Sequence, residues 1–157
     1  MPPRPATSSS PPTRLPLVVL HHVLPRGSHY DLLLANPLDP KGLLWAGRIS
    51  RPPARWATMR RFILTPLPPH RRRYLRFEGP LAPKTGPLQG PFRGPFRGRG
   101  QSRGRVKRVD RGWCIATIWS PRRFGLQIHL TGFTGALEGS WRASPRPRWL
   151  VRPRPGA

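Results

Sequence analysis

Residues 124–130 spell "FGLQIHL", in which large apolar side chains alternate with small or polar ones. Successive side chains of a β-strand point to opposite faces, so this alternation separates the stretch into two sets. The apolar set is Phe124, Leu126, Ile128 and Leu130, and the other set is Gly125, Gln127 and His129. The pattern predicts a half-buried strand, and with it a sheet that covers an apolar core.

Seven other short segments have the composition of strands, because they are rich in β-branched and aromatic residues and are bounded by Gly, Pro or Asp. They are "LPLVVLHH", "HYDLLL", "GLLWAGRI", "YLRFEG", "GRVKRVDRG", "WCIATIWS" and "LEGSWRA". No long window has a convincing helical period, although "PPARWATMRRFI" could hold one or two helical turns. We therefore expect a mainly β fold: a small closed or curled β-barrel with one or two short helical turns and a long flexible Pro/Gly/Arg loop.

Composition divides the chain into one domain and two tails. Residues 1–14 are rich in Pro and Ser and are predicted to be a disordered tail. Residues 15–143 form the predicted barrel domain, interrupted by a flexible insert rich in Gly, Pro and Arg at 82–104. Residues 144–157 are predicted to be a basic, Pro-rich tail, in which the apolar residues 149–151 could dock as a small patch.

The charge balance is extreme, with 29 Lys and Arg against 5 Asp and Glu and a net charge of +24. Three of the basic residues are lysines, so 26 are arginines. A genome rich in G and C would also inflate Arg and Pro, so codon drift is an alternative origin of part of this bias. A charge of this size attracts polyanions in either case, and it indicates nucleic acid as the partner. No basic amphipathic helix is visible that would favour a membrane surface.

The sequence also indicates the cellular compartment. Cys114 is the only cysteine, which excludes an internal disulfide framework. The longest apolar run near the N-terminus, "LPLVVL", is too short for the core of a signal peptide and for a transmembrane helix. We expect a soluble, monomeric protein of the cytoplasm that associates with the nucleoid.

The insert contains the tandem repeat "GPFRGPFRG". One interpretation is an Arg/Gly segment that binds nucleic acid, with Phe92 and Phe96 stacking on bases. The arginines that would contact the nucleic acid are Arg93, Arg97, Arg99 and Arg103. The alternative is a loop expanded by repetition that only stays solvated.

The stretch "SHYDLLL" places His29 and Asp31 two residues apart in a predicted strand, so both project from one face. An imidazole beside a carboxylate supplies two ligands for a divalent metal. The preceding strand ends in His21 and His22, and a hairpin through "VLPRGS" can bring one of them alongside. The pattern predicts a metal site of two histidines and one aspartate, and the alternative is a hydrogen-bonded surface pair.

A second candidate group lies in "PLPPHRRRYLRFEGP". His70 precedes a predicted strand on which Tyr74 and Arg76 share one face. An imidazole, a phenol and a guanidinium can grip a phosphate, and the first two can also pass it a proton. The alternative is a basic surface loop that runs into a half-buried strand.

Taken in order, these segments resemble the 3′-phosphoesterase domain of bacterial ATP-dependent DNA ligase D, an end-joining repair enzyme. The resemblance is carried by "VVLHH", "SHYDLLL", "LLW", "LPPHRRRYLRFEGP", "GRVKRVDRG", "LTG" and "LEGSW", and it spans about residues 17–143. It implies a compact β-barrel and a manganese-dependent activity that removes 3′-terminal ribonucleotides or 3′-phosphates from DNA. The implied partners are DNA 3′ ends and a separate DNA ligase or end-joining factor.

The resemblance also implies which residues form the site. They are His22, His29 and Asp31 as ligands of Mn²⁺, with His70, Tyr74 and Arg61 at the scissile phosphate. The family has an arginine two residues after the metal-binding aspartate, and here that position is Leu33. Loss of this phosphate contact would weaken transition-state stabilisation. The second functional hypothesis is therefore a catalytically eroded, basic module that only binds nucleic acid.

Overall fold

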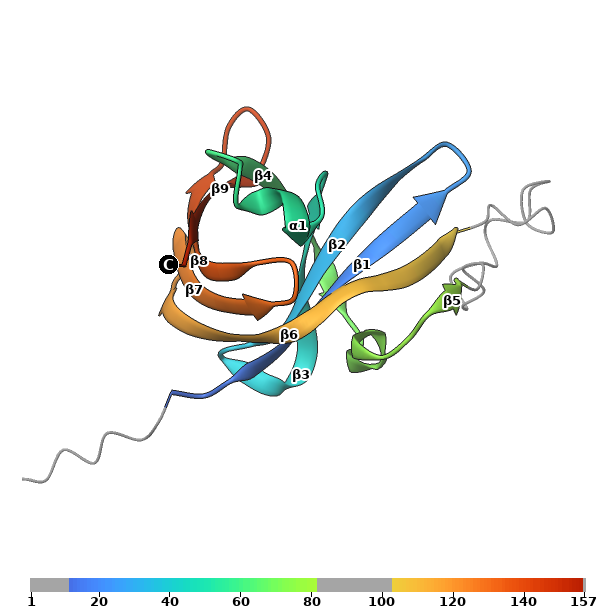
Figure 1. The fold of residues 1–157 in the computed structure, drawn as a ribbon, viewed down its shortest axis with the longest axis horizontal. Helices are drawn as coiled ribbons and strands as arrows, with labels where there is room; N and C mark the ends of the chain where they lie inside the picture. The colour runs from blue at the N-terminus through green and yellow to red at the C-terminus, as the bar shows by residue number, and fades with distance from the viewer. Residues whose placement is uncertain (1–11, 82–102, 157) are drawn as a thin grey trace, which may run out of the picture.

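The computed structural model describes residues 12–81 and 103–156, which form a closed antiparallel barrel of eight strands with one extra strand, β5 (Figure 1). The strand order is β1-β2-β3-β4-β9-β8-β7-β6-β5, and pairing of β1 with β6 closes the ring. The strands are β1 (Leu15–Leu24), β2 (Gly27–Asn36), β3 (Asp39–Ile49), β4 (Phe62–His70), β5 (Gly79–Pro80), β6 (Arg105–Trp119), β7 (Arg123–Leu130), β8 (Thr134–Arg142) and β9 (Arg148–Pro155). A short helix, α1 (Pro53–Trp56), and a 3₁₀ turn, η1 (Arg72–Leu75), complete the described elements. The prediction of a small β-barrel is confirmed.

The barrel interior is filled by the apolar residues that alternate along each strand. All four apolar residues of the β7 stretch are buried, as their alternation predicts. Trp56 of α1 is fully buried and closes one end of the barrel, where its ring stacks on Phe62 with 5.3 Å between centroids. Its indole N–H donates a hydrogen bond to the Arg51 carbonyl at 3.0 Å, so the polar atom of this plug is also satisfied.

The β1–β2 hairpin is covered on both faces. Its inner face contributes to the barrel core. On its outer face Val18, Leu20 and Leu33 join residues of β3 and β6 in a second apolar cluster, whose other members are Leu44, Ala46 and Val106. The chain between β4 and β5 lies over this cluster and packs Tyr74, Leu75 and Phe77 against it. The outer-face side chains of β1 and β2 next to this cluster therefore lie beside the chain between β4 and β5, which we call the covering segment, rather than in open solvent.

The C-terminal segment corrects one prediction. Residues 148–155 form β9, a barrel strand between β4 and β8, and not part of a basic tail. Trp149 and Val151 are buried in the barrel core, and they alternate along the strand with the less buried Arg148, Leu150 and Arg152.

The prolines of β9 occupy positions where a strand tolerates them. The Gly156 N–H donates to the Thr134 carbonyl of β8. Because N–H groups alternate in direction along a strand, those of Arg154 and Arg152 also point toward β8. Pro153 and Pro155 therefore stand at positions whose N–H would face away from β8. Pairing of β9 with β4 ends at Val151, so these prolines remove no hydrogen bond from the sheet.

Two further predictions are wrong in detail. Tyr74 does not lie on a strand, because residues 72–75 form η1, where the N–H groups of Tyr74 and Arg76 each donate to the carbonyl three residues earlier. The segments "GRVKRVDRG" and "WCIATIWS" form one continuous strand, β6, rather than two.

The repeat in the insert, with Arg93, Arg97 and Arg99, lies outside the described residues. Over the described ranges, no helix is long and apolar enough to cross a bilayer.

The role of β9 in the core can be tested by comparing two adjacent residues. We expect Trp149→Ala to cost about 3–5 kcal/mol of unfolding free energy, because it leaves a cavity among Phe124, Trp141 and Trp45. The control, Leu150→Ala, lies on the outer face and should cost about 1 kcal/mol or less. Urea denaturation of both variants checks this, and equal small losses would contradict a structural role for β9.

Candidate metal centre

The hairpin register brings the three predicted metal ligands to one place. His22 of β1 lies directly across from His29 of β2, and Asp31 follows two residues later on the same face. This face is the outer one, shared with Leu20 and Leu33 of the second apolar cluster. The choice between the two adjacent histidines follows from the pleat, because His21 lies on the opposite face.

His21 has a different neighbour. Its ring stacks on the Tyr30 ring with 4.6 Å between centroids and 17° between planes. The structure therefore groups His22, and not His21, with His29 and Asp31.

The ligand atoms of this metal cluster, which we define as His22, His29 and Asp31, converge. His22 Nδ1 lies 3.1 Å from His29 Nε2 and 3.7 Å from Asp31 Oδ2, and His29 Nε2 lies 3.1 Å from Asp31 Oδ1. One nitrogen or oxygen from each residue lies within 4.8 Å of the others. The side chains are 7–15 % exposed, so the cluster is shielded but open to one side.

The tautomer of His22 is fixed by the backbone. His22 Nε2–H donates a hydrogen bond to the Arg103 carbonyl at 2.5 Å, so the lone pair of the ring belongs to Nδ1 and faces the other two residues. Donation of the remote ring N–H to a carbonyl is the usual way in which a protein orients a metal-binding histidine. Arg103, predicted to contact nucleic acid, thus orients His22 through its main chain.

The lowered pKa of His29 keeps its imidazole in the neutral form that binds a metal. Burial is the main reason that the pKa of His29 is lowered from 6.5 to about 4, and the charges of Arg48, His22 and His21 lower it further. The imidazole is therefore neutral at pH 7 and retains a lone pair.

The carboxylate has the opposite shift. Burial raises the pKa of Asp31, although the positive charges of His22, His70 and Arg48 oppose the rise. Because the folded state holds this proton more tightly than the unfolded state does, the ionised carboxylate destabilises the ion-free fold at neutral pH.

Asp31 is exceptional among the buried carboxylates. Only two acidic residues are buried in the described chain, Asp31 and Asp110. Asp110 accepts hydrogen bonds from the backbone N–H groups of Arg111, Thr131 and Gly132 at 2.7–2.9 Å, so it has a structural explanation. Asp31 Oδ1 accepts none from the described groups, even though His29 Nε2 is only 3.1 Å away. Two imidazole nitrogens and a carboxylate oxygen that converge in this way are a ligand set that fits a divalent cation.

A cavity of about 960 Å³ opens beside the metal cluster. It lies between the outer face of β1–β3 and the covering segment, and Asp31 and His22 form part of its wall. The other polar residues that line it are Arg48, His70, Arg71, Arg73, Tyr74 and Arg103. The pocket thus combines the metal cluster with cationic side chains and with an imidazole–phenol pair.

His70 and Tyr74 meet as predicted, although through η1 and not along a strand. Their rings are 5.8 Å apart in an edge-to-face arrangement, and both line the pocket. His70 Nδ1–H donates to the Pro68 carbonyl at 2.7 Å, which leaves Nε2 with the free lone pair. His70 is close enough to Asp31 for its charge to affect the pKa of that carboxyl.

Two of the predicted arginines are not in the pocket. Arg61 precedes β4 and His70 ends it, so the nine intervening steps of extended chain separate them by roughly 30 Å. Arg76 is exposed at the end of η1 and does not line the cavity. Arg71 and Arg73, from the same run of arginines, are the ones that do.

Arg48 is the residue that sequence reasoning missed. It lies on β3 directly opposite Asp31, and its charge affects the pKa of both Asp31 and His29. Leu33, which occupies the arginine position of the ligase D family, is fully buried in the second apolar cluster. Arg48 thus supplies a guanidinium on the metal-cluster face from the neighbouring strand. The signal in the sequence is "WAGRI", but only the β2–β3 register connects it to Asp31.

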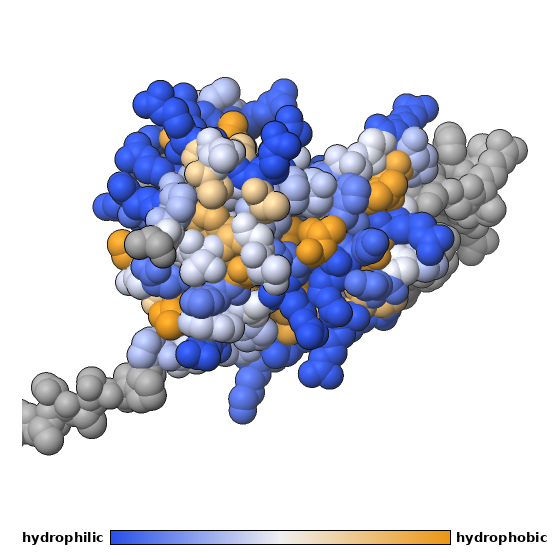
Figure 2. All heavy atoms as spheres, viewed as in Figure 1, coloured by the Kyte–Doolittle hydropathy of each residue, from blue (hydrophilic) through white to orange (hydrophobic). Residues whose placement is uncertain are grey.

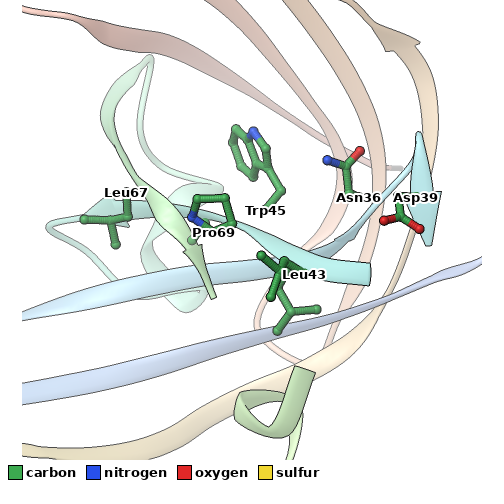
Figure 3. Close-up of a pocket in the computed structure, with 8 residues that line it drawn as sticks. Asn36, Asp39, Leu43, Trp45, Leu67 and Pro69 are labelled. Atoms are coloured by element: carbon green, nitrogen blue, oxygen red, sulfur yellow. The ribbon is translucent and has the colours of Figure 1, made fainter. Parts of the chain in front are cut away.

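A second pocket is smaller, at about 190 Å³, and lies at the irregular pairing of β3 with β4 (Figure 3). Asn36 and Asp39 lie at one end of it and Leu67 and Pro69 at the other, with Trp45 between them. Asp39 is its one titratable lining residue, so this pocket does not present a set of catalytic groups.

Comparison with known proteins adds no assignment. The chain matches no model of a known protein family, and no curated protein sequence matches it. The interpretation of the site therefore depends on its geometry and chemistry.

Metal binding can be measured through stability. We expect Mn²⁺ at 100 times its Kd to stabilise the protein by about 2.7 kcal/mol, since an ion that binds only the folded state shifts the unfolding equilibrium. His22→Ala should lose this stabilisation, whereas the matched control His21→Ala should keep it, because His21 lies on the other face. Thermal unfolding with and without Mn²⁺ checks both, and equal behaviour of the two variants would argue against the cluster as the binding site.

The cost of the unpaired carboxylate gives a separate prediction. In the presence of a chelator at pH 7, Asp31→Asn should be more stable than the wild type by roughly 1 kcal/mol, because it removes a buried charge whose Oδ1 accepts no hydrogen bond. The gain should narrow as the pH falls from 7 into the acid range, because the raised pKa lets the wild-type carboxyl take up its proton in the folded state before it does so in the unfolded chain. Chemical denaturation across this pH range measures it, and a less stable variant at pH 7 would refute the explanation.

Proposed function

We propose that the protein is a metal-dependent phosphoesterase that processes DNA 3′ ends, removing a terminal ribonucleotide or phosphate to leave a 3′-hydroxyl, with Mn²⁺ as the ion. The observation that carries the proposal is the metal cluster, in which a buried carboxylate oxygen accepts no hydrogen bond, set beside a pocket with cationic walls. The resemblance to the phosphoesterase domain of DNA ligase D suggests the same reaction and a role in end-joining repair.

Each part of the pocket has a task in this reaction. A divalent ion at His22, His29 and Asp31 would supply positive charge to a phosphate oxygen and would make water more acidic. Arg48 and Arg73 bind the remaining phosphate oxygens, since guanidinium groups match phosphate with two parallel hydrogen bonds.

His70 and Tyr74 complete the set. Because His70 Nδ1–H is held by the Pro68 carbonyl, Nε2 is the atom that carries a proton to or from the leaving oxygen. Tyr74 lies edge-on to that ring and restricts its rotation.

The dimensions and charge of the pocket favour a nucleotide unit over a free phosphate. A volume of about 960 Å³ exceeds what one phosphate needs, and Phe77 and Leu81 add an apolar wall against which a sugar and base can pack. A net charge of +24 raises the local concentration of nucleic acid around the molecule.

The alternative function is a nucleic-acid-binding module without catalysis. The observation that favours it is Leu33, whose burial in an apolar cluster leaves no arginine at the family position. Arg48 separates the two functions, because it is required for turnover only if it replaces that arginine.

The test uses a labelled primer–template that ends in one 3′-ribonucleotide. With Mn²⁺, we expect the wild type to trim this end and Asp31→Ala to be inactive while still binding the DNA. Arg48→Gln should lower kcat by about 10²–10³-fold, the usual loss for one group that stabilises developing charge. The control is Arg111→Gln, an exposed β6 residue that does not line the pocket and should retain full kcat.

Two results would contradict the proposal. Tight, salt-sensitive binding without trimming would favour the binding module. Trimming that persists in Asp31→Ala would place the active site elsewhere.

A further inference from the structure

The far side of the barrel carries a surface of arginines that the proposed reaction does not use. The pleat of β8 and β9 points alternate residues outward, and arginines occupy many of these positions. We define the distal arginine face as Arg61, Arg123, Arg142, Arg148, Arg152 and Arg154. Figure 1 shows β8 and β9 across the molecule from β1 and β2, and in Figure 2 hydrophilic residues gather over β9, β4 and α1.

The strand register places these side chains close together. Arg142 of β8 lies directly opposite Arg148 of β9. Arg61 comes just before Phe62, whose β4–β9 partner Val151 is followed in the chain by Arg152. Like charges at directly opposed positions destabilise a sheet.

One acidic residue accompanies the distal arginine face. Glu138 lies opposite Arg152 and accepts an ion-pair contact from Arg154 Nε at 3.0 Å. It is the one acidic residue between 111 and 156, so six arginines share one carboxylate and the face keeps a formal charge of +5. An anion that bridges these guanidinium groups would relieve their mutual repulsion.

We propose that the distal arginine face binds the phosphate backbone of double-stranded DNA, separately from the pocket. Guanidinium groups bind phosphates through paired hydrogen bonds and are the side chains most used for this contact. Such contacts release counterions and carry no sequence preference.

The apolar residues of this surface favour duplex over single-stranded DNA. Proteins that bind single strands stack the bases on exposed aromatic rings. The aromatic residues of β8 and β9, Trp141 and Trp149, pack against the barrel core, and the exposed apolar side chain is Ile63, which has no ring. The arginines also spread from the start of β4 across β9 and β8 to β7, which makes a surface roughly 15 Å wide rather than a narrow groove.

The position of the distal arginine face determines how many DNA segments one molecule can hold. In the ring of eight strands, β9 and β8 are four places away from β1 and β2, on the opposite wall of the barrel. One straight duplex cannot contact both walls, so a molecule with both surfaces occupied holds two DNA segments. This consequence rests on the proposed function of the pocket, but duplex binding by the face does not.

The experiment uses a dumbbell duplex closed by hairpins at both ends, because it has no 3′ end to enter the pocket. The variant Arg142→Gln/Arg152→Gln is compared with the control Lys41→Gln/Arg111→Gln, which removes the same charge from exposed positions outside the face. Fluorescence anisotropy over a salt series is measured for the full chain, together with trimming of the primer–template at saturating DNA.

We expect the distal pair to bind the dumbbell about tenfold more weakly and to lower the slope of log Kd against log salt by about two, because each substitution removes one arginine–phosphate interaction. The control pair should change the slope by less than about half a unit, and trimming should be unaffected in both.

Equal losses of affinity in the two pairs would overturn the proposal, since they would show a general effect of charge. A larger loss on anionic lipid vesicles than on the dumbbell would also overturn it and would identify a membrane-binding face. Failure of trimming in the wild type would reject the pocket function and leave this comparison intact.

Discussion

The structure depends on the burial of one hairpin, β1–β2, on both of its faces. The inner face completes the barrel, and the outer face is covered by the chain between β4 and β5. Double burial explains why these strands consist of nearly unbroken apolar runs, "LPLVVL" and "DLLLA", instead of an alternating pattern. Asp31 lies where the outer apolar cluster ends, so its carboxylate is removed from water by the same packing that holds the domain together.

The metal cluster illustrates how a site is distinguished from ordinary structure. Asp110 is buried to a similar degree, yet three backbone N–H groups satisfy it and it holds the turn between β7 and β8. Asp31 Oδ1 accepts no hydrogen bond from the described residues, and the backbone contact of His22 turns the lone pair of its Nδ1 toward the other two residues. The difference between the two aspartates lies in their hydrogen bonds and not in their burial, and it indicates which of them is kept for a ligand.

Many strands of the fold and the three metal-cluster residues can be predicted from local sequence pattern, whereas other parts of the site require the register of distant strands. The alternation in "FGLQIHL" predicts a strand, and the two-residue spacing of His29 and Asp31 places them on one face. Arg48 is adjacent to Asp31 only through β2–β3 pairing, which no local pattern reports. Composition does not predict the strand β9, because a segment rich in proline has the composition of a disordered tail. The prolines of β9 nevertheless occupy positions that leave the sheet intact. The apolar neighbours of Tyr74 fit a strand, but packing over the outer cluster selects a 3₁₀ turn.

The prolines of β9 also bear on how the molecule avoids self-association. Beyond Val151 the strand pairs with no described strand on its β4 side, which leaves a short edge of the kind that recruits strands from other molecules. Pro153 and Pro155 occupy the positions whose donors would face that edge, so an incoming strand finds carbonyls but no N–H groups to pair with. The same residues that give this segment the composition of a disordered tail thus disfavour aggregation through the exposed end of β9.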